Sequence, residues 1–160
     1  MKHFATLSPL PGFQRWLIEA RNNASDQQHP RVQKCLQALA DAGALERMFV
    51  DRSWLRDEAA LAKVAQSLTV LAAHYLMREK YGEDARDRVA NFHLSNGASI
   101  ERINFPADIS RRGQKQSAGL MVNYRYRLKD IENNHESYYG KGEIAHSRAI
   151  ASLLRIRLPD

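Results

Sequence analysis

The sequence of 160 residues contains little cysteine and no long hydrophobic run. Its single cysteine, Cys35, excludes an intramolecular disulfide and gives no reason to expect secretion. No apolar run approaches the roughly 18 residues of a membrane span, and residues 1–20 lack the apolar centre of a signal peptide. These absences favour a cytoplasmic protein with no membrane partner.

The common ligand-binding motifs are also absent. The sequence has no Gly-x-Gly-x-x-Gly, no Walker loop, no His-Glu-x-x-His and no paired cysteines, so nothing local supports a dinucleotide, phosphate-loop or zinc site. The net charge is +6, but the arginines are scattered and do not alternate with aromatic residues as in an RNA-binding sheet. We therefore expect a small anionic ligand or a role in solubility for this charge, and no nucleic acid.

The composition that remains is that of one globular domain. Hydrophobic residues make up 44% and charged residues 26%, which suits a chain with a packed core. Helical spacing predicts helices in residues 13–21, in a segment opened by Pro30, in the long periodic segment from Asp57 to Gly82, and in the tail from residue 142. The apolar faces predicted for the second and third helices are Val32, Cys35, Leu36 and Leu39, and Leu61, Val64, Leu68, Leu71, Tyr75 and Leu76.

The second half of the chain contains the strand signals. The string "GLMVNYRYRL" alternates with a period of two over nine residues and predicts a strand, and "SIERINF" is a weaker candidate. The string "NFHLSNGA" predicts an extended piece that runs into an Asn-Gly turn. The expected fold class is mixed α/β, or α+β, in a single domain.

A few polar residues lie in apolar surroundings and are candidates for chemistry. They are Ser8, His93, Asn96 and Asn123, with the nearby Tyr124 and Tyr126. A hydroxyl and an imidazole in one pocket can perform acid/base or nucleophilic work, because histidine titrates near neutral pH. The residues leave a plainer alternative open, in which Ser8 caps the following helix, with Pro9 at its first position, and backbone groups satisfy His93 in a core.

Four strings carry a family resemblance. In this order and at these separations, the chain closely resembles the C-terminal part of the malonyl-CoA decarboxylases, over nearly its whole length. The strings are "FATLSPLPGFQRWL", "LAAHYLMREKYG", "RVANFHLSNGASIERIN" and "QSAGLMVNYRYRL". The resemblance implies a catalytic domain similar to the GNAT acyltransferase fold. It also implies that Ser8 and His93 are the catalytic pair and that Asn123 and Tyr126 line the same site. Asn96, which lies near His93 in the sequence, is a further candidate for binding substrate.

The implied reaction fits these residue types. Loss of carbon dioxide from malonyl-CoA leaves an enolate, so the site must polarise the malonyl group and supply one proton to carbon. On this reading Ser8 polarises the malonyl group and His93 protonates the enolate. The thioester carbonyl accepts the electrons, so we expect no metal and no other cofactor.

The chain departs from the family in length. The family's helical N-terminal domain, the strands before the serine motif and the segment that binds the CoA pyrophosphate have no counterpart, so residues 1–160 are expected to be a partial catalytic domain. Three explanations for the missing upstream half compete. Met1 is an internal methionine of a longer reading frame, or the chain is the remnant of a broken gene, or a separate polypeptide supplies that half; the first two are favoured over the third. The expected consequence is little or no activity in the isolated chain, with any homo-oligomer formed through the full-length protein. The alternatives are a non-catalytic remnant or interaction fragment and, less favoured, a GNAT-type acyltransferase.

Overall fold

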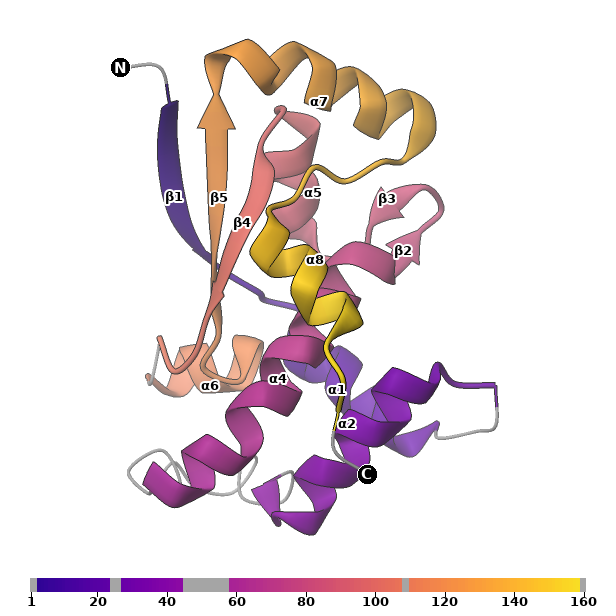
Figure 1. Ribbon diagram of the computed structural model, residues 1–160, viewed down its shortest axis with the longest axis vertical. Helices are drawn as coiled ribbons and strands as arrows, with labels where there is room; N and C mark the ends of the chain where they lie inside the picture. Colours follow the sequence, from indigo (N-terminus) through magenta and orange to yellow (C-terminus); the bar gives the residue numbers. More distant parts are fainter. Residues whose placement is uncertain (1–2, 24–26, 45–57, 108–109, 159–160) are drawn as a thin grey trace.

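A computed structural model describes residues 3–23, 27–44, 58–107 and 110–158 of the chain. It contains a three-stranded antiparallel sheet with the order β1-β5-β4, which lies at the left in Figure 1, with α7 above it, α6 below it and most of the other helices to its right. The strands are β1 (His3–Pro9), β5 (Met121–Arg127) and β4 (Ser99–Asn104), and a small hairpin pairs β2 (Lys80–Tyr81) with β3 (Asp84–Ala85). The helices are α1 (Phe13–Asn22), α2 (Pro30–Asp41), α4 (Glu58–Arg78), α5 (Arg88–Ser95), α6 (Arg111–Ser117), α7 (Leu128–Lys141) and α8 (Arg148–Arg155). The predicted mixed α/β class is confirmed, and the GNAT-like arrangement stays a prediction.

The two faces of the sheet differ sharply in burial. Val122, Tyr124 and Tyr126 of β5 are buried, whereas the residues between them are half-buried. Since successive side chains of a strand point to opposite faces, the helices cover one face only. The alternation predicted for "GLMVNYRYRL" is thus confirmed, and the "SIERINF" strand is confirmed as β4.

The helical core follows the apolar spacing of the sequence. In α2 the four predicted positions, from Val32 to Leu39, are all buried, and Pro30 is the first helical residue. In α4 the predicted positions from Val64 to Leu76 are buried, while Asp57 and the side chain of Leu61 lie outside the described part of the chain. The predicted end of this helix at Gly82 is wrong, because α4 ends at Arg78 and Gly82, with φ +60°, serves the β2–β3 turn.

Several further elements differ from the sequence prediction. The "NFHLSNGA" string is helical and not extended, since Asp87 caps α5 by accepting hydrogen bonds from the N–H groups of Val89 and Ala90. The opening residues form strand β1, whose apolar Phe4 and Leu7 are more than half exposed and gave no period-two signal. Helices α6 and α7 had no predicted counterpart, and the tail helix predicted from residue 142 begins only at Arg148, as α8.

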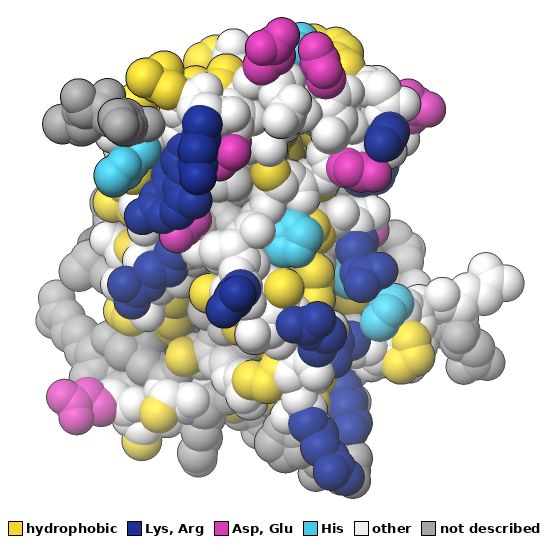
Figure 2. Space-filling model, turned by 45° about the horizontal axis from the view of Figure 1, so that its top comes forward, with side chains coloured by type: hydrophobic (Ala, Val, Ile, Leu, Met, Phe, Trp, Pro, Cys, Tyr) yellow, Lys and Arg dark blue, Asp and Glu magenta, His cyan; other side chains and the backbone are white. Residues whose placement is uncertain are grey.

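The surface agrees with the scattered charges of the sequence. Figure 2 shows lysine and arginine side chains in several separate groups on this face, with most of the acidic side chains in its upper part. Among the described residues, no helix is both long enough and apolar enough to span a bilayer.

The buried His74 is expected to make stability depend on pH. Burial first, and then neighbouring positive charges, lower the pKa of His74 from 6.5 to about 4. Those neighbours are His29, Arg78 and Arg31, while a carboxylate oxygen of Glu79 lies 3.9 Å from Nε2 of His74. The unfolded chain binds the proton near pH 6.5 and the folded chain only near pH 4. The free energy of unfolding therefore falls by about 3 kcal/mol as the pH drops through this window.

Urea unfolding at pH 7 and pH 4.5 measures this effect. His74→Gln removes the titrating group, so we expect the variant to lose about 2 kcal/mol less than the wild type between the two pH values. An equal loss in both proteins would contradict the role of His74.

Candidate active site

Ser8 lies on the covered face of the sheet, near the end of the edge strand β1. The register pairs Ser8 with Val122 of β5, and antiparallel partners share a face, so the Ser8 side chain points to the same side as Tyr124 and Tyr126. Ser8 is 8% exposed, and its Oγ lies 3.4 Å from the Oγ1 of Thr6. The plainer alternative for Ser8 is wrong, because α1 begins at Phe13 and its N-cap is Gly12.

His93 projects from α5 toward the same face. Its Nε2 lies 3.0 Å from the Oγ of Ser8, and its Nδ1 lies 2.5 Å from the hydroxyl of Tyr126. The imidazole also stacks on the ring of Tyr124, with centroids 4.2 Å apart and planes 22° apart. Two side chains therefore fix the orientation of His93 and a third fixes its plane, so the alternative of a backbone-satisfied histidine is wrong.

Burial determines the protonation states of His93 and Tyr126. Desolvation lowers the pKa of His93 and raises the pKa of Tyr126, so at neutral pH the imidazole is mostly neutral and the phenol keeps its proton. We assign the Tyr126 hydroxyl as donor to Nδ1, which leaves the imidazole proton on Nε2, facing Ser8. Tyr126, His93 and Ser8 thus form a line of hydrogen bonds that ends at the serine hydroxyl.

Exposed aromatic side chains flank this line. Phe4, on the same face of β1, stacks on Tyr126 with centroids 4.7 Å apart, and it is 53% exposed. Phe92, next to His93 on α5, is 61% exposed. The buried polar groups of the site thus lie beside an apolar surface that can contact a ligand.

Two of the predicted substrate-binding residues lie apart from this line. Asn96 ends α5, is exposed, and donates its side-chain N–H to the carbonyl of Phe92. Asn123 belongs to the opposite face of β5, where its amide binds the carbonyl of Thr6 and accepts from Asn104. The structure therefore brings together Ser8, His93 and Tyr126, and it does not bring Asn123 to them.

Sequence reasoning did not assign roles to Thr6 or Tyr124. Thr6 precedes Ser8 by two residues, and a period of two along a recognised strand would have placed both hydroxyls on one face. Tyr124 likewise shares the face of Tyr126, two residues away. Its buried hydroxyl has no hydrogen-bond partner among the described residues.

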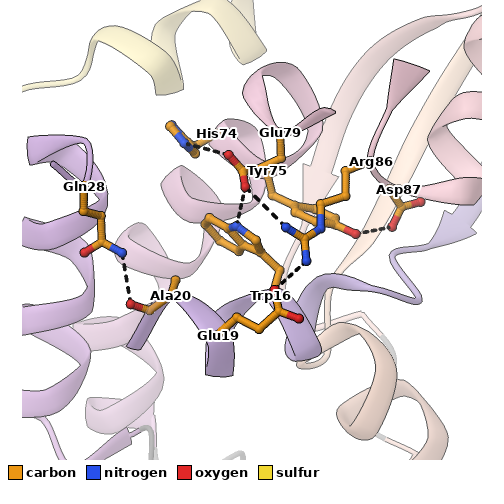
Figure 3. Close-up of polar contacts among 9 residues, drawn as sticks. All are labelled: Trp16, Glu19, Ala20, Gln28, His74, Tyr75, Glu79, Arg86 and Asp87. Atoms are coloured by element: carbon orange, nitrogen blue, oxygen red, sulfur yellow. Dashed lines mark hydrogen bonds and ion pairs between the residues drawn. The ribbon is translucent and has the colours of Figure 1, made fainter. Parts of the chain in front are cut away.

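A separate pocket of about 490 Å³ lies among α1, α2 and the end of α4. Figure 3 shows part of its polar lining, in which Glu79 accepts the indole N–H of Trp16 and lies 3.6 Å from Arg86. Its lining contains neither Ser8 nor His93. Among the described residues, no group of three His, Cys, Asp or Glu side chains is placed to hold a metal ion.

The fold and the site define a mixed α/β domain that joins a serine hydroxyl to a histidine imidazole. The family model described as "Malonyl-CoA decarboxylase C-terminal domain" matches residues 1–159. The chain belongs to the malonyl-CoA decarboxylase family, and the resemblance read from its sequence is confirmed.

Individual relatives give the extent of the similarity. The mitochondrial malonyl-CoA decarboxylase of Mus musculus is 38% identical over 161 residues, which cover 94% of this chain and 32% of that protein. The crystal structure of malonyl-CoA decarboxylase from Rhodopseudomonas palustris superposes with a TM-score of 0.83 at 38% identity, covering 95% of this chain and 33% of that one. The structure from Agrobacterium vitis gives a TM-score of 0.78, also at 38% identity, over 96% of this chain and 36% of that one. The chain spans about a third of the length of these relatives.

Proposed function

We propose that this chain supplies the catalytic serine and histidine for decarboxylation of malonyl-CoA to acetyl-CoA and carbon dioxide. Membership of the family supports the reaction. The observation that carries it to particular residues is the 3.0 Å contact between the Oγ of Ser8 and the Nε2 of His93, both buried. The cytoplasmic location and any homo-oligomer stay predictions.

The hydrogen bonds run in one direction in this proposal. Tyr126 donates to Nδ1 of His93, Nε2 of His93 donates to the Oγ of Ser8, and the Ser8 hydroxyl is left to donate to the substrate. A hydroxyl in this state is a donor for the thioester oxygen, on which negative charge develops. Ser8 is therefore the group that polarises the malonyl thioester.

The reaction then balances with groups of this chain and water. The bond between the α-carbon and the carboxylate breaks, carbon dioxide leaves, and the electron pair forms the thioester enolate. The Nε2 proton of His93 moves to the α-carbon while the phenol proton of Tyr126 moves to Nδ1. Solvent then protonates Nε2 and Nδ1 returns its proton to Tyr126, which restores the starting tautomer. The thioester carbonyl accepts the electrons, so the proposed mechanism uses no metal or other cofactor.

The activity test uses a chimaera with residues 1–160 in place of the matching third of the Rhodopseudomonas palustris protein. We expect it to release carbon dioxide from malonyl-CoA and to form acetyl-CoA. Ser8→Ala should lower the rate by about a hundredfold, the loss typical of one oxyanion donor. The isolated chain, for which we propose little activity, is assayed beside it.

Ser99→Ala is the matched control, because Ser99 belongs to the same sheet and its hydroxyl contacts only the carbonyl of Arg125 among the hydrogen bonds described for it. It should keep the full rate. A folded chimaera that forms no acetyl-CoA would overturn the proposed reaction, and full activity in Ser8→Ala would overturn the role of the serine.

A further inference from the structure

The carboxylate of Asp87 joins the segments that carry the two site residues. Its Oδ1 accepts the N–H groups of Val89 and Ala90, each at 3.0 Å, and so caps the helix that carries His93. The backbone N–H of Gly12, in the turn that follows the Ser8 strand, donates to the same carboxylate. Asp87 is 1% exposed, so these bonds are shielded from water.

Helix α4 is the third segment that contacts the Asp87 carboxylate. The hydroxyl of Tyr75, from α4, donates to Oδ2 of Asp87 at 3.3 Å, and Figure 3 shows it pointing at the carboxylate. A Cβ atom at Gly12 would lie 2.5 Å from this hydroxyl, so the turn packs directly on Tyr75 without an intervening side chain. The same turn is tied from its other side by Ser117, whose Oγ accepts the N–H of Leu10 at 2.9 Å.

We propose that Asp87 is a positioning residue that sets the separation of Ser8 and His93 by binding the turn after β1 and the first turn of α5 at once. The inference rests on the proposed function for its catalytic consequence. Ser8 and His93 are 85 residues apart, and the two come from different elements. A common anion that accepts N–H groups from both elements fixes one against the other.

Small displacements matter at such a contact. Hydrogen bonds depend on geometry, and an error of about 1 Å in a reacting group can cost a hundredfold in rate. Asp87 is the N-cap of the helix that carries His93, six positions before it, so any change in the docking of the α5 N-terminus moves the imidazole. Asp87 itself contacts neither Ser8 nor His93 in the hydrogen bonds described for it, so its effect passes through the elements it binds.

Asp87→Asn is the informative variant. Asparagine is as good an N-cap as aspartate, so α5 keeps its cap, but one acceptor oxygen and the charge that bind Gly12 and Tyr75 are lost. In the isolated chain we expect the imidazole ¹⁵N signals of His93 to shift and its lowered pKa to rise toward 6.5 as the ring gains solvent. In the chimaera we expect turnover to fall tenfold or more, with KM changed less than about threefold.

Ser147→Ala is the control for a purely structural role. Ser147 caps α8 by accepting the N–H of Ile150 and has no described contact with the site, so its loss removes a cap elsewhere. It should lower stability without moving the His93 signals or the rate. If Asp87→Asn behaves like Ser147→Ala, the positioning role is overturned. If the wild-type chimaera does not decarboxylate malonyl-CoA, the proposed function fails, and the His93 signals still decide the inference.

Discussion

Replacement of His93 by asparagine is expected to lower carbon dioxide release in the chimaera by about a thousandfold, within the range for loss of a general acid. Asparagine cannot transfer a proton at neutral pH, so the enolate would have to take its proton from water. The ring stacking on Tyr124 and the bond to Tyr126 are lost as well. We expect the free energy of unfolding to fall by about 2 kcal/mol, because His93 is buried and these contacts are lost with it.

The control for this variant is His3→Asn, since His3 is an exposed histidine on β1. The rate and the free energy of unfolding should both stay at the wild-type values. Acetyl-CoA formation and urea unfolding are measured on each protein. Near-full turnover in a folded His93→Asn protein would remove His93 from the mechanism.

Replacement of Gly97 by alanine should destabilise the fold by about 4 kcal/mol, the sum of a backbone cost and a steric cost. Gly97 follows α5 with φ +87°, where an L-residue costs about 1–2 kcal/mol. Its Cβ would also overlap the carbonyl oxygen of Ile131 in α7, and backbone cannot move aside as a side chain can. Overpacking of this kind adds about 1–3 kcal/mol.

Gly82→Ala separates the two contributions. Gly82 has φ +60°, and a Cβ atom added there would meet no atom within 4 Å, so it carries only the backbone cost of about 1–2 kcal/mol. Urea unfolding of both variants at one pH gives the difference that belongs to the contact with Ile131. Equal losses in the two variants would show that α7 does not restrict this position.

The strand β5 and the helices α2 and α4 were predictable because their burial is one-sided. Tyr124 and Tyr126 face the helices while Asn123 and Arg125 do not, and such a division leaves a period in the sequence. The strand β1 left none, because at the edge of the sheet its apolar Phe4 and Leu7 are exposed on opposite faces. The apolar and polar pattern of an edge strand depends on which elements cover each of its faces. The local sequence does not contain that information.

The string "NFHLSNGA" around His93 was predicted wrongly for a different reason. Its Asn-Gly pair is typical of a hairpin turn, but here Asn96 and Gly97 end a helix, and Gly97 takes the positive φ common at such ends. The deciding residue is Asp87, which lies before the string and caps the helix. The pairing of Ser8 with His93 was available only through the family resemblance, because no spacing rule relates a strand residue to a helix residue so distant in sequence.

The register of β1 against β5 has a consequence for folding. Ser8 lies opposite Val122, and a slip of one residue would turn the serine hydroxyl to the face of Asn123, away from the imidazole. Among the described residues this pairing joins the first strand to the last, and closing so long a loop costs more entropy than forming a local contact. The hydroxyl and the imidazole can therefore meet only in molecules in which β1 and β5 have paired with the correct alignment. A signal from the Ser8–His93 hydrogen bond would count the correctly folded fraction of a sample, which helix content alone would overestimate.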